Sequence, residues 1–177
     1  MKLNVDALLL SLLLGLSHGI EPDHVATARL LKSKRKIVEF ALSHSAGFLI
    51  IAIPIVIFIG SNRIFEFIAD IIGIIFSILL LIEVILDKEF DIGANKAGLL
   101  QGAFVITPTK VLVIVLASTD YNLIYSAEII LAFILASIFS ISALAILNLI
   151  PKRIYKFVDG IIAIVTITYL ISLLVIN

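Results

Sequence analysis

The sequence lacks cysteine altogether and has only three histidines among its 177 residues. The absence of cysteine excludes disulfides, thiolate metal sites and membrane thiol-reductase chemistry. The chain also lacks His-Glu-x-x-His, the motif of zinc peptidases, and Gly-x4-Gly-Lys-[Ser/Thr], the motif of ATP-hydrolysing proteins. We therefore expect a protein that is not an enzyme and that does not itself hydrolyse ATP.

Charged residues make up only 15% of the chain, whereas 62% is hydrophobic and the mean hydropathy is +1.24. A helix that crosses a bilayer needs about 20 mostly apolar residues. Six stretches meet this requirement, namely 3–28, 37–60, 64–86, 97–117, 124–147 and 154–176. The first is too long and too charged at its end for a cleaved signal peptide. The composition predicts an all-α polytopic membrane protein with six transmembrane helices in a single membrane domain, 1–177.

The net charge is zero, but the cations are distributed unevenly among the connections. The stretch 29–36 holds five of them, 87–96 holds two and 151–156 holds three, whereas the other two connections hold only Arg63. Positive residues mark cytoplasmic loops. We therefore expect a cell-membrane protein with 29–36, 87–96 and 151–156 in the cytoplasm and both termini outside. The basic loop 29–36 is expected to set this orientation rather than to bind lipid headgroups or nucleic acid.

Two pairs of similar segments indicate an internal repeat. Residues 63–67 (RIFEF) resemble 153–157 (RIYKF), and 14–19 (LGLSHG) resemble 97–102 (AGLLQG). Each half of three helices, 1–90 and 91–177, would be inverted relative to the other because three is odd. Inverted repeats are common in secondary transporters, whose substrate site lies near the repeat interface. Both halves also carry Gly-x3-Gly, at Gly15/Gly19 and Gly98/Gly102, which favours close helix packing.

All three histidines lie inside apolar, helix-like sequence. Ionisable groups at membrane depth are costly and therefore indicate function. At a rise of about 1.5 Å per residue from the inner boundary, His18 lies about 16 Å deep, Asp23 about 9 Å, His24 about 7 Å and His44 about 12 Å. His44 thus falls between the two ends of the first motif, and the four side chains are expected to meet.

Two imidazoles and a carboxylate within seven residues are typical of a site for a divalent transition metal. Pro22 lacks an N–H and should disrupt the helix, and Gly19 should ease the bend that His18 and His24 need to face one ion. The metal ligands predicted are His18, Asp23, His24 and His44. The alternative is that the histidines form hydrogen bonds between helices. Glu21 is either a second-shell or entry carboxylate, or a charge at the bend that faces water.

The run His18-x4-Asp23-His24 resembles the signature of the nickel/cobalt transporter family, close to His-Ala-x-Asp-Ala-Asp-His-Ile, in which Glu21 here replaces one acid by another. Ser43-His44-Ser45 resembles the family's Gly-His-Ser motif, which adds Ser45 as a second-shell residue. The resemblance covers about residues 14–48 and implies a secondary permease for Ni²⁺ or Co²⁺.

The sequence also departs from this family. Typical members have eight helices, whereas six fit here, and the family's Ala-Ile-Asp-Asn continuation is replaced by 27–30 (TARL). The later Asp-Thr motifs are absent. The chain is most similar to the shorter, six-helix branch that resembles urease-accessory nickel permeases.

Further polar residues lie within the predicted spans. Asp70, Lys110 and Glu128 fall at one outer depth, where they are expected to pair and either line an outer vestibule or gate, or reach the interface. Gln101 occupies the repeat position of His18 and is expected to hydrogen-bond across the pseudo-twofold axis. Residues 107–109 (TPT) are expected to break the fourth helix. Near the inner face, Glu83, Asp87 and Asp159 are expected to be solvated.

Three function classes follow from these features. The first is a permease for a divalent transition-metal cation, which is the substrate and not a resident cofactor. The second is a membrane metalloenzyme, and the third is a non-transporting membrane subunit of a metal-uptake complex. The expected partners are the metal ion and the lipid bilayer, without nucleic acid, and a homo-oligomer is compatible with the sequence.

Overall fold

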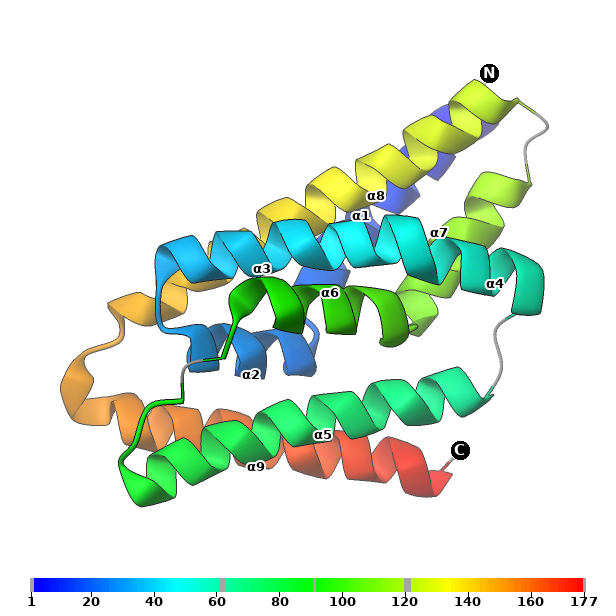
Figure 1. Cartoon of the computed structure of the whole chain (residues 1–177). Helices are drawn as coiled ribbons and strands as arrows, with labels where there is room; N and C mark the ends of the chain where they lie inside the picture. Colours follow the sequence, from blue (N-terminus) through cyan, green and yellow to red (C-terminus); the bar gives the residue numbers. More distant parts are fainter. Residues whose placement is uncertain (1, 61–62, 91, 120–121, 177) are drawn as a thin grey trace.

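The computed structural model describes residues 2–60, 63–90, 92–119 and 122–176, and within these ranges all regular secondary structure is helical (Figure 1). Four helices in these ranges are long and apolar enough to cross a membrane: Lys34–Ile59, Arg63–Leu86, Leu123–Leu149 and Tyr155–Val175. A fifth crossing is possible by length if the helices Ala94–Phe104 and Pro108–Ser118, bent by 60° at their junction, form one span. The all-helical architecture predicted from composition is confirmed for the described residues, and the long apolar helices indicate a membrane-embedded protein.

The predicted first and fourth spans are each broken into two helices. Two residues separate α1 (Lys2–Gly19) from α2 (Pro22–Leu31), and three residues separate α6 (Ala94–Phe104) from α7 (Pro108–Ser118). In both pairs the second helix starts at a proline, whose fixed φ suits the first helical turn and whose missing N–H has no partner there anyway. The break expected at residues 107–109 is therefore present.

The remaining long helices are α3 (Lys34–Gly47), which continues through the π-helical η1 (Phe48–Ala52) into α4 (Ile53–Ile59), then α5 (Arg63–Leu86), α8 (Leu123–Ala143) and α9 (Tyr155–Ile176). Short 3₁₀ turns, η2 (Leu144–Leu149) and η3 (Lys152–Ile154), join α8 to α9. The π-helical turns end two positions before Pro54, which cannot donate to the regular α-helical ladder.

Three helix pairs dominate the packing: α1 against α8, α3 against α6, and α5 against α9. Glycines permit the first two. A Cβ on Gly15 or Gly19 would overlap α8, at Phe133 and Ser140 respectively, and a Cβ on Gly102 would overlap the backbone of His44 on α3. The Gly-x3-Gly motifs therefore serve close packing, as predicted. The bond of Ser140 Oγ to the carbonyl of Leu16, at 2.7 Å, adds to the α1–α8 contact.

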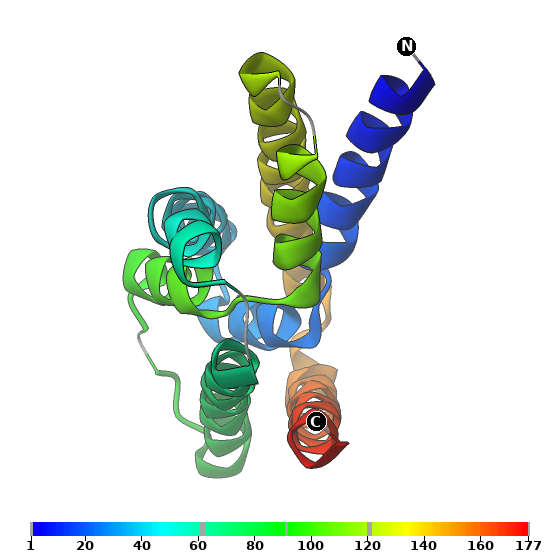
Figure 2. The ribbon, with the colours of Figure 1, turned by 90° about the vertical axis from the view of Figure 1, so that its right-hand side faces the viewer.

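The helix ends gather at two opposite ends of the molecule. In Figure 1 the start of α1 and the ends of α4, α7 and α9 lie on the right, whereas the ends of α2, α5 and α8 lie on the left. Figure 2, viewed from that right-hand side, shows α4, α5 and α9 nearly end-on, with α1, α7 and α8 rising away from them. The left-hand end carries the cation-rich connections, and we call it the basic end.

Candidate metal centre

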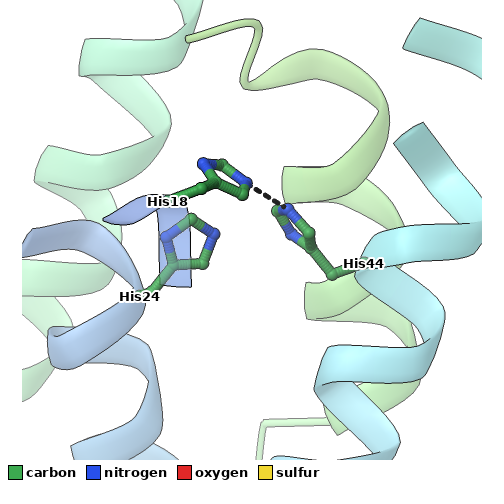
Figure 3. Close-up of side chains that lie close together, drawn as sticks. All are labelled: His18, His24 and His44. Carbon is green, nitrogen blue, oxygen red and sulfur yellow. Dashed lines mark hydrogen bonds between the residues drawn. The ribbon is translucent and has the colours of Figure 1, made fainter. Parts of the chain in front are cut away.

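The three histidines come together at the break between α1 and α2. His18 is in the last turn of α1, His24 in the first turn of α2, and His44 faces both from α3 (Figure 3). His18 and His24 are 0% exposed and His44 is 1% exposed. The ring centroids are 4.7 Å apart for His18–His24 and for His24–His44, and 5.3 Å apart for His18–His44. All the histidines in the chain therefore form one buried cluster.

The spacing of their nitrogens suits a bound ion. The Nε2 atoms of His18 and His44 are 3.1 Å apart, and one nitrogen from each of the three rings lies within 4.8 Å of the others. An ion that binds imidazole at about 2.1 Å separates ligands at right angles by about 3.0 Å and opposite ligands by about 4.2 Å. The His18–His44 distance matches ligands at right angles, and the third nitrogen is near enough for a small movement of the rings to complete the set.

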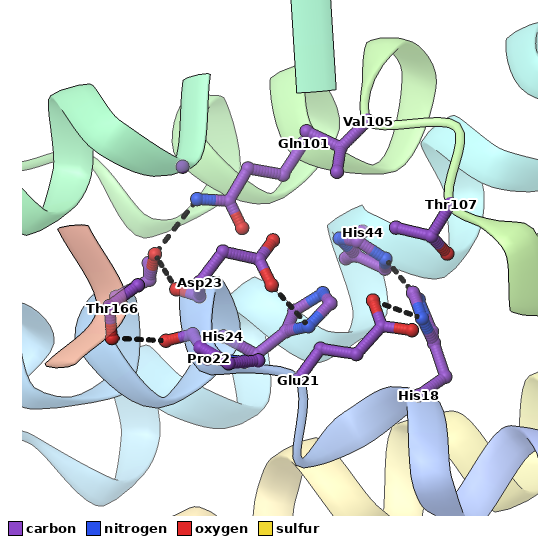
Figure 4. A network of polar contacts seen from close by, with 12 residues as sticks. His18, Glu21, Pro22, Asp23, His24, His44, Gln101, Val105, Thr107 and Thr166 are labelled. Carbon is purple, nitrogen blue, oxygen red and sulfur yellow. Dashed lines mark hydrogen bonds and ion pairs between the residues drawn. The ribbon is translucent and has the colours of Figure 1, made fainter. Parts of the chain in front are cut away.

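Two carboxylates from the same break border the cluster (Figure 4). Asp23 Oδ1 lies 3.3 Å from His24 Nδ1, and Glu21 Oε2 lies 3.0 Å from His18 Nδ1. Glu21, Asp23 and His24 form a second group whose ligand atoms lie within 4.8 Å of one another. The carboxylates and imidazoles thus offer two overlapping sets of ligands.

The second broken helix supplies a residue that the sequence analysis missed. Thr109, in the first turn of α7, donates from Oγ1 to Glu21 Oε1 at 2.8 Å and lies 3.2 Å from His18 Nδ1. The same hydroxyl lies 2.8 Å from Thr107 Oγ1. Outer hydrogen bonds of this kind orient the ligands of metal sites. The only available sequence signal was the Thr-Pro-Thr break itself, which brings hydroxyls to the end of a half-helix.

The sequence predicted that Lys110 would pair with Asp70 or Glu128, but it does not. It is fully buried, and its Nζ donates to the carbonyls of Gln101, Gly102 and Val105 at 3.3, 3.1 and 2.8 Å. The depth count treated 97–117 as one continuous helix, whereas the break frees carbonyls at the end of α6 that attract a cation. Lys110 consequently lies at the break, where it lines a small cavity together with His18, His44 and Ser45.

Gln101 and Ser45 are both buried beside the cluster. Gln101 donates from Nε2 to Thr27 Oγ1 on α2 at 2.8 Å, so its contact crosses between the halves but does not reach His18 (Figure 4). Its Oε1 and the Oγ of Ser45 have no hydrogen-bond partner among the residues described. Ser45 therefore remains available to the small cavity that it shares with His18 and His44.

A larger cavity of about 440 Å³ adjoins the cluster, and four acidic side chains contribute to its otherwise mostly apolar lining. Glu21 and Asp23 contribute from the start of α2, and Glu66 and Asp70 contribute from α5. The start of α5 and the end of α9 form its walls, so it faces the end of the molecule opposite the basic end. Asp70 thus lies on an approach to the histidines, whereas Glu128 is exposed on α8 and is not part of this cavity.

At the basic end, ion pairs join α2, α5 and α9. Arg29 Nε donates to Asp159 Oδ1, and Lys32 Nζ lies 2.8 Å from Glu83 Oε2. Lys156 Nζ lies 2.9 Å from Asp87 Oδ1. Glu83 and Asp159 are therefore buried and paired, not solvated as expected, because α2 folds back between α5 and α9 and brings its cations to them.

Residues 15–19 (GLSHG) match the Gly-x-Ser-x-Gly pattern of esterases, in which the serine sits on a sharp turn between strand and helix. Here the five residues lie inside α1, and Ser17 is exposed and donates to the carbonyl of Leu14 at 2.9 Å. The turn that would activate the serine is absent from this part of the chain. The pattern therefore gives no support to a hydrolase.

Comparisons of the chain with protein-family models, with curated proteins and with solved structures gave no match.

Proposed function

We propose that this protein is a secondary transporter of the cell membrane that carries a divalent transition-metal cation, with Ni²⁺ or Co²⁺ as the favoured substrate. The observation that carries the proposal is the buried cluster of His18, His24 and His44, with nitrogens close to coordination distance. The cluster lies between broken helices, the place where many transporters bind their substrates. The resemblance of residues 14–48 to nickel/cobalt transporters supports the same substrate class.

Hydrogen bonding between helices is a weaker explanation for these histidines. His18 Nε2 and His44 Nε2 are within hydrogen-bond distance of each other, and His24 Nδ1 faces Asp23. Nε2 of His24 and Nδ1 of His44, however, have no partner among the residues described. Buried polar groups are almost always hydrogen-bonded, because each unpaired one costs about 1–3 kcal/mol. An ion that takes up these lone pairs explains why three imidazoles are kept together in an apolar bundle.

The chemistry of the ligands limits which metal ions the site can favour. Imidazole and carboxylate suit Ni²⁺, Co²⁺, Zn²⁺ and Fe²⁺, whereas the absence of cysteine disfavours Cu⁺. Mg²⁺ and Ca²⁺ prefer oxygen ligands and would gain little from three imidazoles. We assign His18, Asp23, His24 and His44 as substrate ligands, with Glu21, Ser45 and Thr109 supporting them.

An inverted repeat accounts for the helix packing. In this reading α1–α2 corresponds to α6–α7, α3–α4 to α8, and α5 to α9. Under this twofold relation, the contact of α1 with α8 is equivalent to the contact of α6 with α3, and α5 contacts its own counterpart, α9. These are the three dominant helix contacts. We propose six crossings, with the broken pair α1–α2 as the first and both termini outside.

The repeat also suggests how substrate is held and released. The carbonyl end of α6 is neutralised by Lys110, whereas the carbonyl end of α1 lies at His18 and Glu21, where a cation would be favoured. The acidic cavity leads to this site from the outside, and the Arg29–Asp159 pair closes the basic end. Rocking of the two halves would open the basic end and close the cavity.

Uptake by the chain alone tests the proposal. We expect proteoliposomes that contain only this protein to accumulate ⁶³Ni²⁺ or ⁵⁷Co²⁺, and a His18→Ala/His24→Ala variant reconstituted to the same density to show only the leak of empty liposomes. Metal binding without uptake would instead identify a subunit that needs a partner. Absence of both would remove the proposed function.

The orientation is tested by cysteine labelling, because the wild-type chain has no cysteine and is its own control. Ser33 and Ser118 are separated by three proposed crossings, and Ser118 is exposed at the end of α7. We expect a membrane-impermeant maleimide to label Ser118→Cys on intact cells and Ser33→Cys only after permeabilisation. Labelling of both from one side would show that α6–α7 is not a complete crossing.

A further inference from the structure

The two cavities beside the histidines differ greatly in size. The small one, lined by His18, His44, Ser45 and Lys110, has no room for a water molecule, whereas the acidic one measures about 440 Å³. Six waters at about 30 Å³ each occupy about 180 Å³. The acidic cavity can therefore hold a divalent ion with its hydration shell, and the histidine cluster can hold only an ion that has shed most of its water.

The acidic residues come from two helices that pack closely. Glu66 and Asp70 are four residues apart on α5 and thus share a face of that helix. A Cβ on Gly73, one turn further along α5, would lie 3.2 Å from Asp23 Cβ, so α2 lies directly against this part of α5. Asp70 is 9% exposed and Glu66 is exposed, which places the pair at the mouth of the cavity and partly within it.

Asp23, whose Oδ1 faces His24, links this cavity to the histidine site. It is 6% exposed, lines the cavity, and its Oδ2 has no hydrogen-bond partner among the residues described. Arg63 lines an adjoining cavity with Glu66 and Asp70, and no ion pair joins it to either of them in the described chain. Lys110 lies near Asp23 but donates to carbonyls of α6.

We propose that Glu66, Asp70 and Asp23 form a second, outer site that binds hydrated divalent cations and passes them to the histidines. The inference rests on the proposed transport function. Carboxylates that bind an ion through its waters distinguish little between Mg²⁺, Mn²⁺ and Ni²⁺, because all keep part of their hydration shell. Selection would then occur in the second step, when imidazoles replace water around a transition metal but not around Mg²⁺.

Stopped-flow binding of Ni²⁺ to the purified, full-length protein tests the outer site. We expect the Glu66→Gln/Asp70→Asn variant to bind Ni²⁺ at least about tenfold more slowly than wild type. A cleft lined by negative charges raises the association rate of a cation by about 10–10³-fold, and the variant loses two of those charges. Equilibrium affinity should stay near wild type because the histidines are intact. Millimolar Mg²⁺ should slow association in the wild type and have no effect in the variant.

Asp6→Asn is the matched control, because Asp6 is an exposed acid near the start of α1 and lies outside the cavity. It should keep wild-type kinetics and Mg²⁺ sensitivity. If the double variant fails to fold, Glu66→Gln alone should show the same loss in smaller degree, since that side chain is exposed. Wild-type association and Mg²⁺ sensitivity in the folded variants would overturn the outer site while leaving the histidine site standing.

Mn²⁺ binding separates this inference from the proposed function. We expect electron paramagnetic resonance to detect bound Mn²⁺ in His18→Ala/His24→Ala protein and to lose that signal when Glu66→Gln/Asp70→Asn is added. Failure of the wild-type protein to bind Ni²⁺ would contradict the proposed histidine site. Absence of Mn²⁺ binding in the histidine variant would contradict only the proposed outer site.

Discussion

Replacing His24 with alanine is expected to abolish high-affinity Ni²⁺ binding. The loss of affinity should exceed the roughly 10–100-fold loss that follows removal of a residue that only hydrogen-bonds to a metal ligand. The His24 ring lies 4.7 Å from each of the other two rings, and its Nε2 has no hydrogen-bond partner among the residues described. Alanine offers no lone pair to a metal ion, so the site would lose one of the four ligands assigned to it. Isothermal titration of purified variants with Ni²⁺ measures the effect.

His18→Ala and Asp23→Ala should cause losses of the same order, and His44→Ala should cost at least about 10–100-fold. Ser17→Ala is the matched control, since Ser17 precedes His18 but is exposed and bonds only within its own helix. Thermal unfolding should show that each variant remains folded. Wild-type affinity for Ni²⁺ in a folded His24→Ala protein would show that the histidines pack and hydrogen-bond between helices rather than bind the metal.

The meeting of the three histidines could be predicted because helical rise is constant. Depth counted from Arg29 and from Lys36 brought His44 level with the motif 18–24, and the structure places their rings together. Pro22 and Pro108 also marked the helix breaks, since proline restricts where an α-helix can begin or continue. The depth of a residue along its helix and the position of a helix break can both be predicted without knowing which helices are neighbours.

The surroundings of the site could not be predicted in the same way. Lys110 was counted along an unbroken helix, and a break of three residues with a 60° bend carried it to the histidines instead. Thr109 contacts Glu21 across 88 residues of sequence, and Arg29 contacts Asp159 across 130. Such contacts depend on how the halves pack together, which a single sequence does not specify.

Replacing Gly102 with alanine is expected to disrupt the metal site without touching a ligand. The new Cβ would overlap the carbonyl oxygen, carbonyl carbon and Cα of His44. Backbone atoms cannot rotate away as a side chain can, so α6 and α3 must separate. We expect a loss of about 1–3 kcal/mol of stability or more. Metal affinity should fall as well, because His44 moves with its backbone.

Gly160→Ala is the matched control, because it introduces the same methyl group inside α9, where the nearest atom of another residue would be 3.8 Å away. Alanine there should stabilise the helix by about 0.5–1 kcal/mol relative to glycine. Thermal unfolding of Gly160→Ala should therefore occur at a slightly higher temperature with Ni²⁺ affinity unchanged, whereas Gly102→Ala should lose both stability and affinity. Wild-type stability and affinity in Gly102→Ala would mean that α6 does not press on His44, and that close packing of α6 against α3 is not what holds His44 in the site.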